Sequence, residues 1–431
     1  MSPFTTSNVK LVYVLLDGIG DLPNPSLNGL TPLDAASTPH MDALAKNGCM
    51  GQVISVGKGV APQSDIAVFN MLGYSFKDRE YVGRGVIEAI GSNIDFRDGD
   101  LALRGNFATV NKKNLQIIDR RAGRIINKDE SLSICKTLHE KIKFSEAEVT
   151  VAIKPTIAHR VSIRFRHRKI RLSEKITNTD PAYDKFAGMG IAKSIGANNM
   201  RLERSKAEEN TKSARISAKI VNEFTEQVIK LLENHPVNKS RLREHRNPIN
   251  AILARDAGNR YPKVEPISKK YDLKMASIVD MPVELGISKV LGMKAFQIGK
   301  VDDYEEKAKF AVKKLKTFNA IYVHIKGPDE FGHDGNANGK KESIEHIDKR
   351  FFGMLMEHLE ADESIIIISG DHSTPCLKRA HSDDPIPILV SGNKIKKDGS
   401  RRFTELYGLR GRMGLLTGQE VLKTVLNMIT N

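Results

Sequence analysis

Short apolar runs bounded by turn residues set the main pattern of this 431-residue chain. Four of them predict buried parallel strands: KLVYVLL (10–16), AIYVHI (320–325), SIIIIS (364–369) and PIPILV (385–390). Helical patterns alternate with these runs, as in TPHMDALAKNG (38–48) and IEHIDKRFFGMLMEHL (344–359). The alternation predicts an α/β fold with a largely parallel sheet and helices on both faces.

One of these strands lies near the N-terminus and three lie at or beyond residue 320, which predicts a long insertion between them. Within the insertion the strand-like stretches are shorter, and a charged helical segment lies near 202–234. The stretches are EVTVAI (148–153), HRVSIRF (159–165) and NAILA (250–254). We therefore expect a core domain built from residues 1–76 and 287–431, and an inserted α+β domain over residues 77–286.

The segment LVYVLLDGIGD (11–21) ends on a carboxylate, Asp17, beside Gly18 and Gly20. A dinucleotide-binding turn would need a third glycine where Pro23 stands. A carboxylate at that turn would also repel phosphate. A cation is the better partner for Asp17.

The other predicted strands carry similar residues at their ends. Asp329 and His333 follow the run 320–325, Asp371 and His372 follow 364–369, and His381 precedes 385–390. An aspartate alone after a strand also suits a turn or a helix cap, and a histidine alone is more often a core or surface residue than a ligand. Ligand sites in parallel α/β sheets form outside the carboxyl ends of the strands, however, so the joint pattern predicts convergence at one edge. Oxygen and nitrogen ligands without thiolate indicate two divalent ions, manganese or zinc, with magnesium as an alternative.

Ser64 lies at the predicted start of a helix in KGVAPQSDIAVFNMLGY. Two roles fit this position. A serine hydroxyl beside bound cations is a nucleophile, and the amides of a helix N-terminus suit an incoming phosphoryl oxygen. A serine at a helix start is equally suited to be the N-cap.

The composition narrows the classes of partner. The net charge of +15 suits small anionic substrates, whereas 6% aromatic residues and the absence of tryptophan argue against a nucleic-acid partner. The basic stretch RFRHRKIR (164–171) is interpreted as a solvated face. The three cysteines are odd in number and scattered, so they indicate neither a disulfide framework nor a thiolate metal cage.

No apolar run reaches the roughly 18 residues of a membrane span, and the N-terminal segment lacks the apolar core of a secretory signal. We therefore expect a cytoplasmic enzyme with no membrane partner. The sequence does not indicate its oligomeric state.

Eight motifs in the same order make the chain resemble a known family over almost its whole length. They are VLLDGIGD, TPLDAASTPHMDALA, PQSDIAVFNMLGY, GRGVIEAIG, RGNFATV, DRRAGRI, GPDEFGHDG and GDHSTP. The chain resembles the archaeal-type cofactor-independent phosphoglycerate mutases of the alkaline phosphatase superfamily.

This resemblance implies an alkaline-phosphatase-like core and interconversion of 3- and 2-phosphoglycerate with two divalent ions, manganese above all, and without 2,3-bisphosphoglycerate. It implies that Ser64 becomes phosphoserine. The ligands it implies for one ion are Asp17, Ser64, Asp371 and His372, and for the other Asp329, His333 and His381. The substrate-binding residues it implies are Asp119, Arg120, His159, Arg160 and Arg255.

Three positions depart from the family pattern, all within the insertion. Leu285 stands where a lysine is expected, Asp256 where a glycine is expected, and the stretch 164–181 is unusually basic. These departures leave two other functions open. One is a phosphatase or phosphotransferase of the same superfamily acting on another small phosphorylated metabolite. The other is a basic binding protein on a degenerate enzyme fold, which the intact set of metal ligands disfavours.

Overall fold

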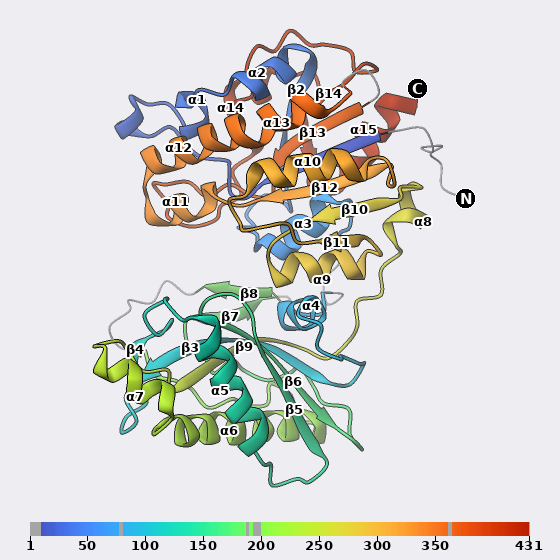
Figure 1. Ribbon diagram of the computed structural model, residues 1–431. Helices are drawn as coiled ribbons and strands as arrows, with labels where there is room; N and C mark the ends of the chain where they lie inside the picture. Colours follow the sequence, from blue (N-terminus) through green and yellow to red (C-terminus); the bar gives the residue numbers. More distant parts are fainter. Residues whose placement is uncertain (1–9, 77–80, 187–188, 193–199, 361–363, 431) are drawn as a thin grey trace. The chain divides into compact units, whose positions relative to one another are not determined.

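The computed structural model describes residues 10–76, 81–186, 189–192, 200–360 and 364–430. The chain forms two compact units (Figure 1). The first unit comprises Met1–Ser75, Val264–Asp280 and Ile287–Asn431, and the second comprises Phe76–Lys263 and Met281–Gly286. The second unit therefore interrupts the first along the sequence.

The first unit is built on an eight-stranded sheet with the strand order β11-β10-β12-β1-β13-β14-β2-β15. The strands are β1 (Lys10–Leu16), β2 (Gly48–Ile54), β10 (Met275–Ile278), β11 (Lys294–Phe296), β12 (Ala320–Ile325), β13 (Ser364–Gly370), β14 (Ile386–Ser391) and β15 (Leu415–Thr417). The four predicted strands are confirmed to within one residue at each end. The central strands β10, β12, β1 and β13 are parallel, which confirms the α/β fold class.

The predicted parallel direction of the last strand is wrong. Strand β14 runs antiparallel to both of its neighbours, β13 and β2. Residues 371–385 form no helix, so the chain returns from β13 without the helical crossover that parallel strands need. The residues just before β14 therefore lie at the same edge of the sheet as the residues just after β13.

Helices cover both faces of this sheet. Val12, Val14 and Leu16 of β1 share one buried cluster with apolar residues of several helices. Those helices are α1 (Pro32–Ala35), α2 (Pro39–Lys46), α10 (Tyr304–Lys314), α12 (Ala337–Ile347) and α13 (Gly353–His358). Tyr13 points to the opposite face, where its hydroxyl donates to the carbonyl of Met71 at the end of α3 (Ser64–Met71), 2.9 Å away.

The remaining elements of the first unit are short. They are α8 (Ile267–Tyr271), α11 (Pro328–Asp334), α14 (Glu405–Arg410), α15 (Val421–Thr430), the 3₁₀ turns Pro25–Leu27 and Gly418–Glu420, and a π-helical turn, Asp348–Phe352, that joins α12 to α13. Helix α9 (Pro282–Val290) begins in the second unit and ends in the first. The helical pattern predicted over 344–359 corresponds to the end of α12, the π turn and α13.

The second unit contains an antiparallel sheet of five strands, ordered β4-β3-β6-β5 with β9 also paired to β3. Its strands are β3 (Leu101–Val110), β4 (Ile117–Asp119), β5 (Val149–Pro155), β6 (Arg160–His167) and β9 (Ala251–Gly258), with a separate hairpin of β7 (Tyr183–Phe186) and β8 (Met189–Ala192). Its helices are α4 (Arg84–Gly91), α5 (Lys128–Lys141), α6 (Lys212–Leu232) and α7 (Pro236–Arg243). Helices α5 and α6 lie beside this sheet (Figure 1). Leu138 of α5 and Phe224 of α6 share one buried cluster with Leu103 and Phe165 of the sheet. The predicted α+β character of the insertion is confirmed.

Over the part of the chain that the structure describes, no helix combines the length and the apolar character needed to cross a bilayer.

Candidate functional site

Three neighbouring parallel strands end at one edge of the first sheet and bring the predicted metal ligands together. Leu16 of β1 is in register with Ile325 of β12 on one side and with Gly370 of β13 on the other. Asp17 and Asp371, the next residues along β1 and β13, are therefore adjacent. Asp329 lies in the first turn of α11, four residues after β12. All seven predicted ligands belong to the first unit.

His372 is the centre of one group of side chains. Its Nε2 lies 3.6 Å from Oδ1 of Asp17, 3.3 Å from Oδ2 of Asp371 and 3.3 Å from Oγ of Ser64. Its Nδ1 lies 3.1 Å from the hydroxyl of Thr374, which fixes the ring. The four residues predicted to share one ion are thus in contact through a single imidazole.

Asp329, His333 and His381 form the second group. Oδ1 of Asp329 lies 3.6 Å from Nε2 of His333 and 3.4 Å from Nε2 of His381. His333 follows Asp329 by four residues on α11, a spacing that places both on one helix face. The rings of His372 and His381 stack with their centres 3.7 Å apart, so the two groups adjoin. His381 reaches the cluster because β14 runs antiparallel to β13.

The chemistry of these groups fits divalent cations. Three sets of side chains each have ligand atoms within 4.8 Å of one another: Asp329, His333 and His381; Asp17, Asp329 and His372; and Asp17, His324 and Asp371. Oδ1 of Asp17 and Oδ2 of Asp371 are buried and have no hydrogen-bond partner among the described residues. Buried carboxylate oxygens beside imidazoles are the donors that manganese, zinc and magnesium accept.

Burial and charge set the protonation of the site. Burial and the neighbouring Asp17 raise the pKa of Asp371 to about 7, against the opposing effect of His324 and Lys326. Burial and the nearby His381 hold the pKa of His372 well below its ordinary value, so this imidazole is neutral at pH 7 and keeps a lone pair for a cation.

Ser64 is the first residue of α3, and Gln63 precedes it as the N-cap. No side chain caps this helix, so the N-cap role considered for Ser64 is not observed. Its hydroxyl instead faces Nε2 of His372.

Two further residues at this edge, His324 and Lys326, were not predicted from the sequence to belong to the site. His324 is fully buried in β12, and its Nε2 lies 3.6 Å from Oδ2 of Asp371. Lys326 follows β12, and its Nζ lies 2.8 Å from Oδ2 of Asp17. The available signal was a histidine inside an apolar strand with a lysine just beyond it.

Two of the predicted substrate-binding arginines, Arg120 and Arg255, share one carboxylate in the second unit. Arg120 and Arg255 donate to the same oxygen of Asp180, at 2.7 and 2.8 Å. The guanidinium of Arg255 also lies 3.8 Å from the ring centre of Tyr183. Nε of Arg120 is buried and has no hydrogen-bond partner within the described ranges.

His159 and Arg160 belong to the same basic cluster, whereas Asp119 serves the adjoining loop. Burial, together with Arg160 and Arg121, lowers the pKa of His159 to about 3, so this imidazole is neutral at pH 7. Asp119 accepts hydrogen bonds from the backbone N–H groups of Arg121 and Gly123 and from Asn247.

Two cations of the basic stretch 164–171 have acidic partners. Arg166 pairs with Asp95 and Asp100, and Lys169 pairs with Glu148. The description of this stretch as a solvated face therefore holds only in part.

Asp256, at the position where glycine is expected, adopts a φ of 58°. This left-handed conformation favours glycine, which accounts for the expected residue type.

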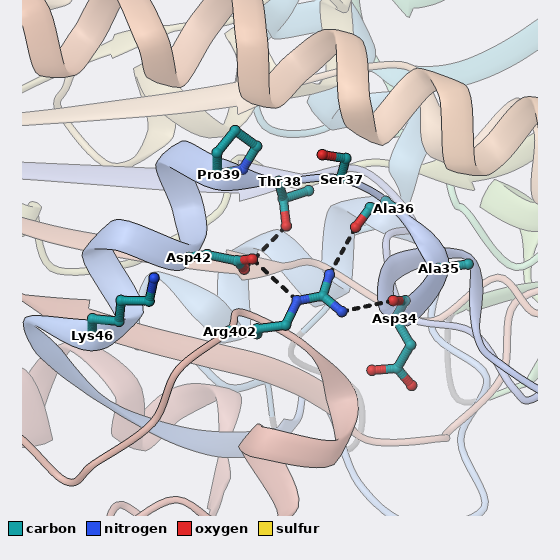
Figure 2. A pocket seen from close by; sticks show the side chains of 9 residues that line it. All are labelled: Asp34, Ala35, Ala36, Ser37, Thr38, Pro39, Asp42, Lys46 and Arg402. Carbon is teal, nitrogen blue, oxygen red and sulfur yellow. Dashed lines mark hydrogen bonds and ion pairs between the residues drawn. The ribbon is translucent and has the colours of Figure 1, made fainter.

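A cavity of about 490 Å³ in the first unit is lined by nine residues, none of them a predicted ligand (Figure 2). Arg402 spans it and donates to the carbonyls of Asp34 and Ala36, at 2.9 and 2.7 Å, and to the carboxylate of Asp42, at 3.1 Å. These bonds tie the end of α1 to α2, and we assign the cavity a structural role.

Comparison with known proteins identifies the family. A relative from Aeropyrum pernix named 2,3-bisphosphoglycerate-independent phosphoglycerate mutase is 39% identical over 420 residues, covering 95% of this chain and 97% of the relative. The chain belongs to the 2,3-bisphosphoglycerate-independent phosphoglycerate mutase family. The family model of that description matches residues 45–238. A relative of the same name from Methanopyrus kandleri is 34% identical over 423 residues, covering 96% of this chain and 95% of the relative.

Two solved structures are similar along the whole chain. A Pyrococcus horikoshii protein is 28% identical with a TM-score of 0.78, covering 98% of this chain and 97% of its own. The cofactor-independent phosphoglycerate mutase of Thermoplasma acidophilum is 27% identical with a TM-score of 0.64, covering 98% of this chain and all of its own. The mutase family inferred from the eight motifs is thus confirmed.

Glu88 of α4 anchors the basic cluster, and its loss has a testable cost. It is buried, and its Oε1 lies 3.0 Å from Arg84 and 3.3 Å from Arg104. Burial alone would raise its pKa, but Arg104 and Arg84 lower it to about 2. The ionised Glu88 carboxylate with its two arginines therefore stabilises the fold at pH values above the ordinary glutamate pKa of 4.5. This contribution is lost as the pH falls towards 2.

We expect Glu88→Gln to lower the free energy of unfolding at pH 7 by about 3 kcal/mol, because it leaves buried guanidinium groups unpaired. The difference from wild type should shrink at pH 3. Urea unfolding followed by circular dichroism measures both values. Glu140→Gln, at an exposed glutamate of α5, is the matched control. An equal loss at the two pH values would contradict the assignment.

Proposed function

We propose that this protein interconverts 3-phosphoglycerate and 2-phosphoglycerate through a phosphoserine at Ser64, as a cytoplasmic enzyme. The observation that carries the proposal is the Ser64 hydroxyl, 3.3 Å from Nε2 of His372 within a cluster of carboxylates and imidazoles. The names of relatives that match this chain along nearly its whole length support the substrate.

Two divalent ions, with manganese as the first candidate, fit the donor atoms of this cluster. Asp17, Ser64, Asp371 and His372 would hold one, and Asp329, His333 and His381 would hold the other. When bound, such ions neutralise charge on phosphoryl oxygens and favour the ionised form of a serine hydroxyl.

Ser64 carries the covalent step. Its Oγ forms a bond to phosphorus while the bond from phosphorus to the C3 oxygen of the substrate breaks, and the hydroxyl proton passes overall to the departing oxygen. The C2 oxygen of glycerate then takes the phosphoryl group and Ser64 is restored. No external phosphate donor is needed, in agreement with independence from 2,3-bisphosphoglycerate.

Other groups of the first unit assist this transfer. Helix α3 begins at Ser64, so its N-terminal N–H groups lie beside the hydroxyl and suit phosphoryl oxygens. The ammonium of Lys326, 2.8 Å from Asp17, adds a positive charge close to the reacting group. His372 is neutral and lies 3.3 Å from the Ser64 hydroxyl, so a cation held by its Nε2 would lie close to the nucleophile.

In the second unit we propose that Arg120, Arg160 and Arg255 bind the anionic groups of the substrate. Guanidinium groups suit carboxylates because both are planar and offer paired hydrogen bonds. His159 is neutral at pH 7 and offers a hydrogen bond to a hydroxyl group. Asp119 would act indirectly, by shaping the turn that carries Arg120 and Arg121.

A second function is favoured by one observation. Leu285, half-buried in α9, supplies no charge where a lysine is expected, which would suit a phosphatase or phosphotransferase for another phosphorylated metabolite. Product analysis separates the two. A mutase converts 3-phosphoglycerate to 2-phosphoglycerate without releasing phosphate, whereas a phosphatase yields glycerate and inorganic phosphate.

The first prediction concerns the metal ligands. We expect Asp329→Ala and His381→Ala each to lower turnover about a thousand-fold, because several kcal/mol of charge stabilisation would be lost. Steady-state kinetics with added manganese measures this loss. Asp334→Ala, an exposed residue of the same helix α11, should leave turnover unchanged. Full turnover in chelator-treated enzyme would exclude a metal-dependent reaction.

The second prediction concerns Ser64. Acid quenching during turnover, followed by peptide mass spectrometry, should detect a phosphoryl group on the peptide that contains Ser64, and only when substrate is present. The Ser64→Ala variant should lose both the modification and mutase activity while still binding manganese through the remaining ligands. Normal turnover in this variant would exclude the nucleophile role.

The third prediction concerns Leu285. Burial lowers the pKa of Arg104 in the second unit, and Arg84, Arg160 and Arg255 lie close enough to lower it further. We expect this positive charge to replace that of the missing lysine, so Leu285→Lys should change kcat/KM for 3-phosphoglycerate by less than about three-fold. If compensation is absent, the new charge should raise efficiency roughly ten- to a hundred-fold, the value of one charge-assisted contact. Leu285→Met controls for the change of side chain without adding charge.

A further inference from the structure

Lys340 of α12 is a fully buried lysine with three hydrogen-bond acceptors. Its Nζ donates to the carbonyl of Gly20 at 3.0 Å, to Oδ2 of Asp21 at 2.8 Å and to the carbonyl of Thr374 at 3.0 Å. Three bonds use the full donor capacity of an ammonium group. The side chain of Asp21 is equally buried, so the pair forms an ion pair shielded from water.

These acceptors lie on two loops that are far apart in the sequence and adjacent in the folded chain. Gly20 and Asp21 belong to the loop after β1, and Thr374 belongs to the loop after β13. The loops also bond to each other, since the N–H of Thr374 donates to the carbonyl of Gly20 at 3.0 Å. The N–H of Cys376 donates to the carboxylate of Asp21 at 3.1 Å. Lys340 therefore lies at the junction of the two loops.

The same loops carry proposed metal ligands: Asp17 on the first, and Asp371 and His372 on the second. Thr374 extends the connection, because its hydroxyl donates to Oδ1 of Asp329 at 2.7 Å and lies 3.1 Å from Nδ1 of His372. A shift of Thr374 would thus move a ligand of each proposed ion.

The packing between the loops leaves little room for such a shift. A Cβ at Gly18 would lie 2.7 Å from the Thr374 hydroxyl and 2.8 Å from Cα of Asp329, closer than real contacts allow. Metal sites bind tightly only when their ligands are held close to the required geometry.

We propose that Lys340 is a positioning residue that holds the loops after β1 and β13 at the separation required to bind the divalent ions. The inference rests on the proposed function only in taking Asp17, Asp371 and His372 as ligands. Lys340 touches neither substrate nor ligand directly and acts through Gly20, Asp21 and Thr374.

The test measures binding of Mn²⁺ alone by isothermal titration calorimetry. Lys340→Met should weaken the affinity 10- to 100-fold, as loss of supporting contacts does at other metal sites. In turnover assays the manganese concentration for half-maximal rate should rise by the same factor, while kcat at saturating manganese stays within about three-fold of wild type. A structural role alone would not produce this separation.

Lys307 provides a matched control in the same unit. It is also fully buried, donates to the carbonyls of Lys300 and Val301, and pairs with Asp280 at 3.3 Å. None of these partners lies on a loop that carries a proposed ligand. Lys307→Met should destabilise the fold but keep the wild-type affinity for Mn²⁺.

Unfolding of Lys340→Met would not prevent the test. The double variant Lys340→Met/Asp21→Asn removes the unpaired carboxylate and keeps an acceptor for Cys376, so it should regain stability yet still bind Mn²⁺ 10- to 100-fold more weakly. Wild-type affinity in either folded variant would overturn the proposal. Wild-type affinity in Asp17→Ala would instead show that the proposed metal ligands are wrong, which is a separate outcome.

Discussion

Asp17 and Asp371 lie side by side at the ends of β1 and β13. The repulsion between these buried carboxylates favours positively charged groups and cations in the surrounding site. In an interior of low polarity, two like charges at adjacent positions cannot both be ionised without nearby positive charge. Burial first, and the neighbouring Asp17 second, raise the pKa of Asp371 to about 7. Positive or polarisable groups accordingly gather there: the ammonium of Lys326, the imidazole of His324 and, by our proposal, the divalent ions.

The sequence was sufficient for the strands and for the set of residues at their ends. Apolar runs bounded by turn residues located β1, β12, β13 and β14 to within one residue, because a buried strand must be apolar on both faces. An apolar run carries no information on its direction, and the parallel assignment of β14 was therefore wrong. The direction is decided by the connection at 371–385, whose lack of a helix becomes clear only in three dimensions. The antiparallel course is also what brings His381 to the cluster.

Residues that act through contacts distant in sequence were the ones missed. His324 lies inside a strand that was recognised by its apolar residues. Asp371 comes 47 residues later, and nothing in the sequence indicates that the two side chains meet. Charge gave a similarly incomplete picture, because the acidic partners of Arg166 and Lys169 lie 21 to 71 residues away in sequence. For Ser64 the sequence left two roles open, and the structure removes only the N-cap role, because Gln63 occupies that position.

The place of β1 in its sheet has a consequence for synthesis of the chain. β1 is made first, yet both of its neighbours, β12 and β13, begin more than 300 residues later. At about 5–20 residues per second, ribosomes need roughly 20 to 70 seconds to make the intervening chain. Throughout that time β1 remains a short apolar segment with two unsatisfied backbone edges, the kind of segment that pairs with other chains. The paired strands of the second unit all precede β12 in the chain, so they are complete before the first partner of β1 has been made.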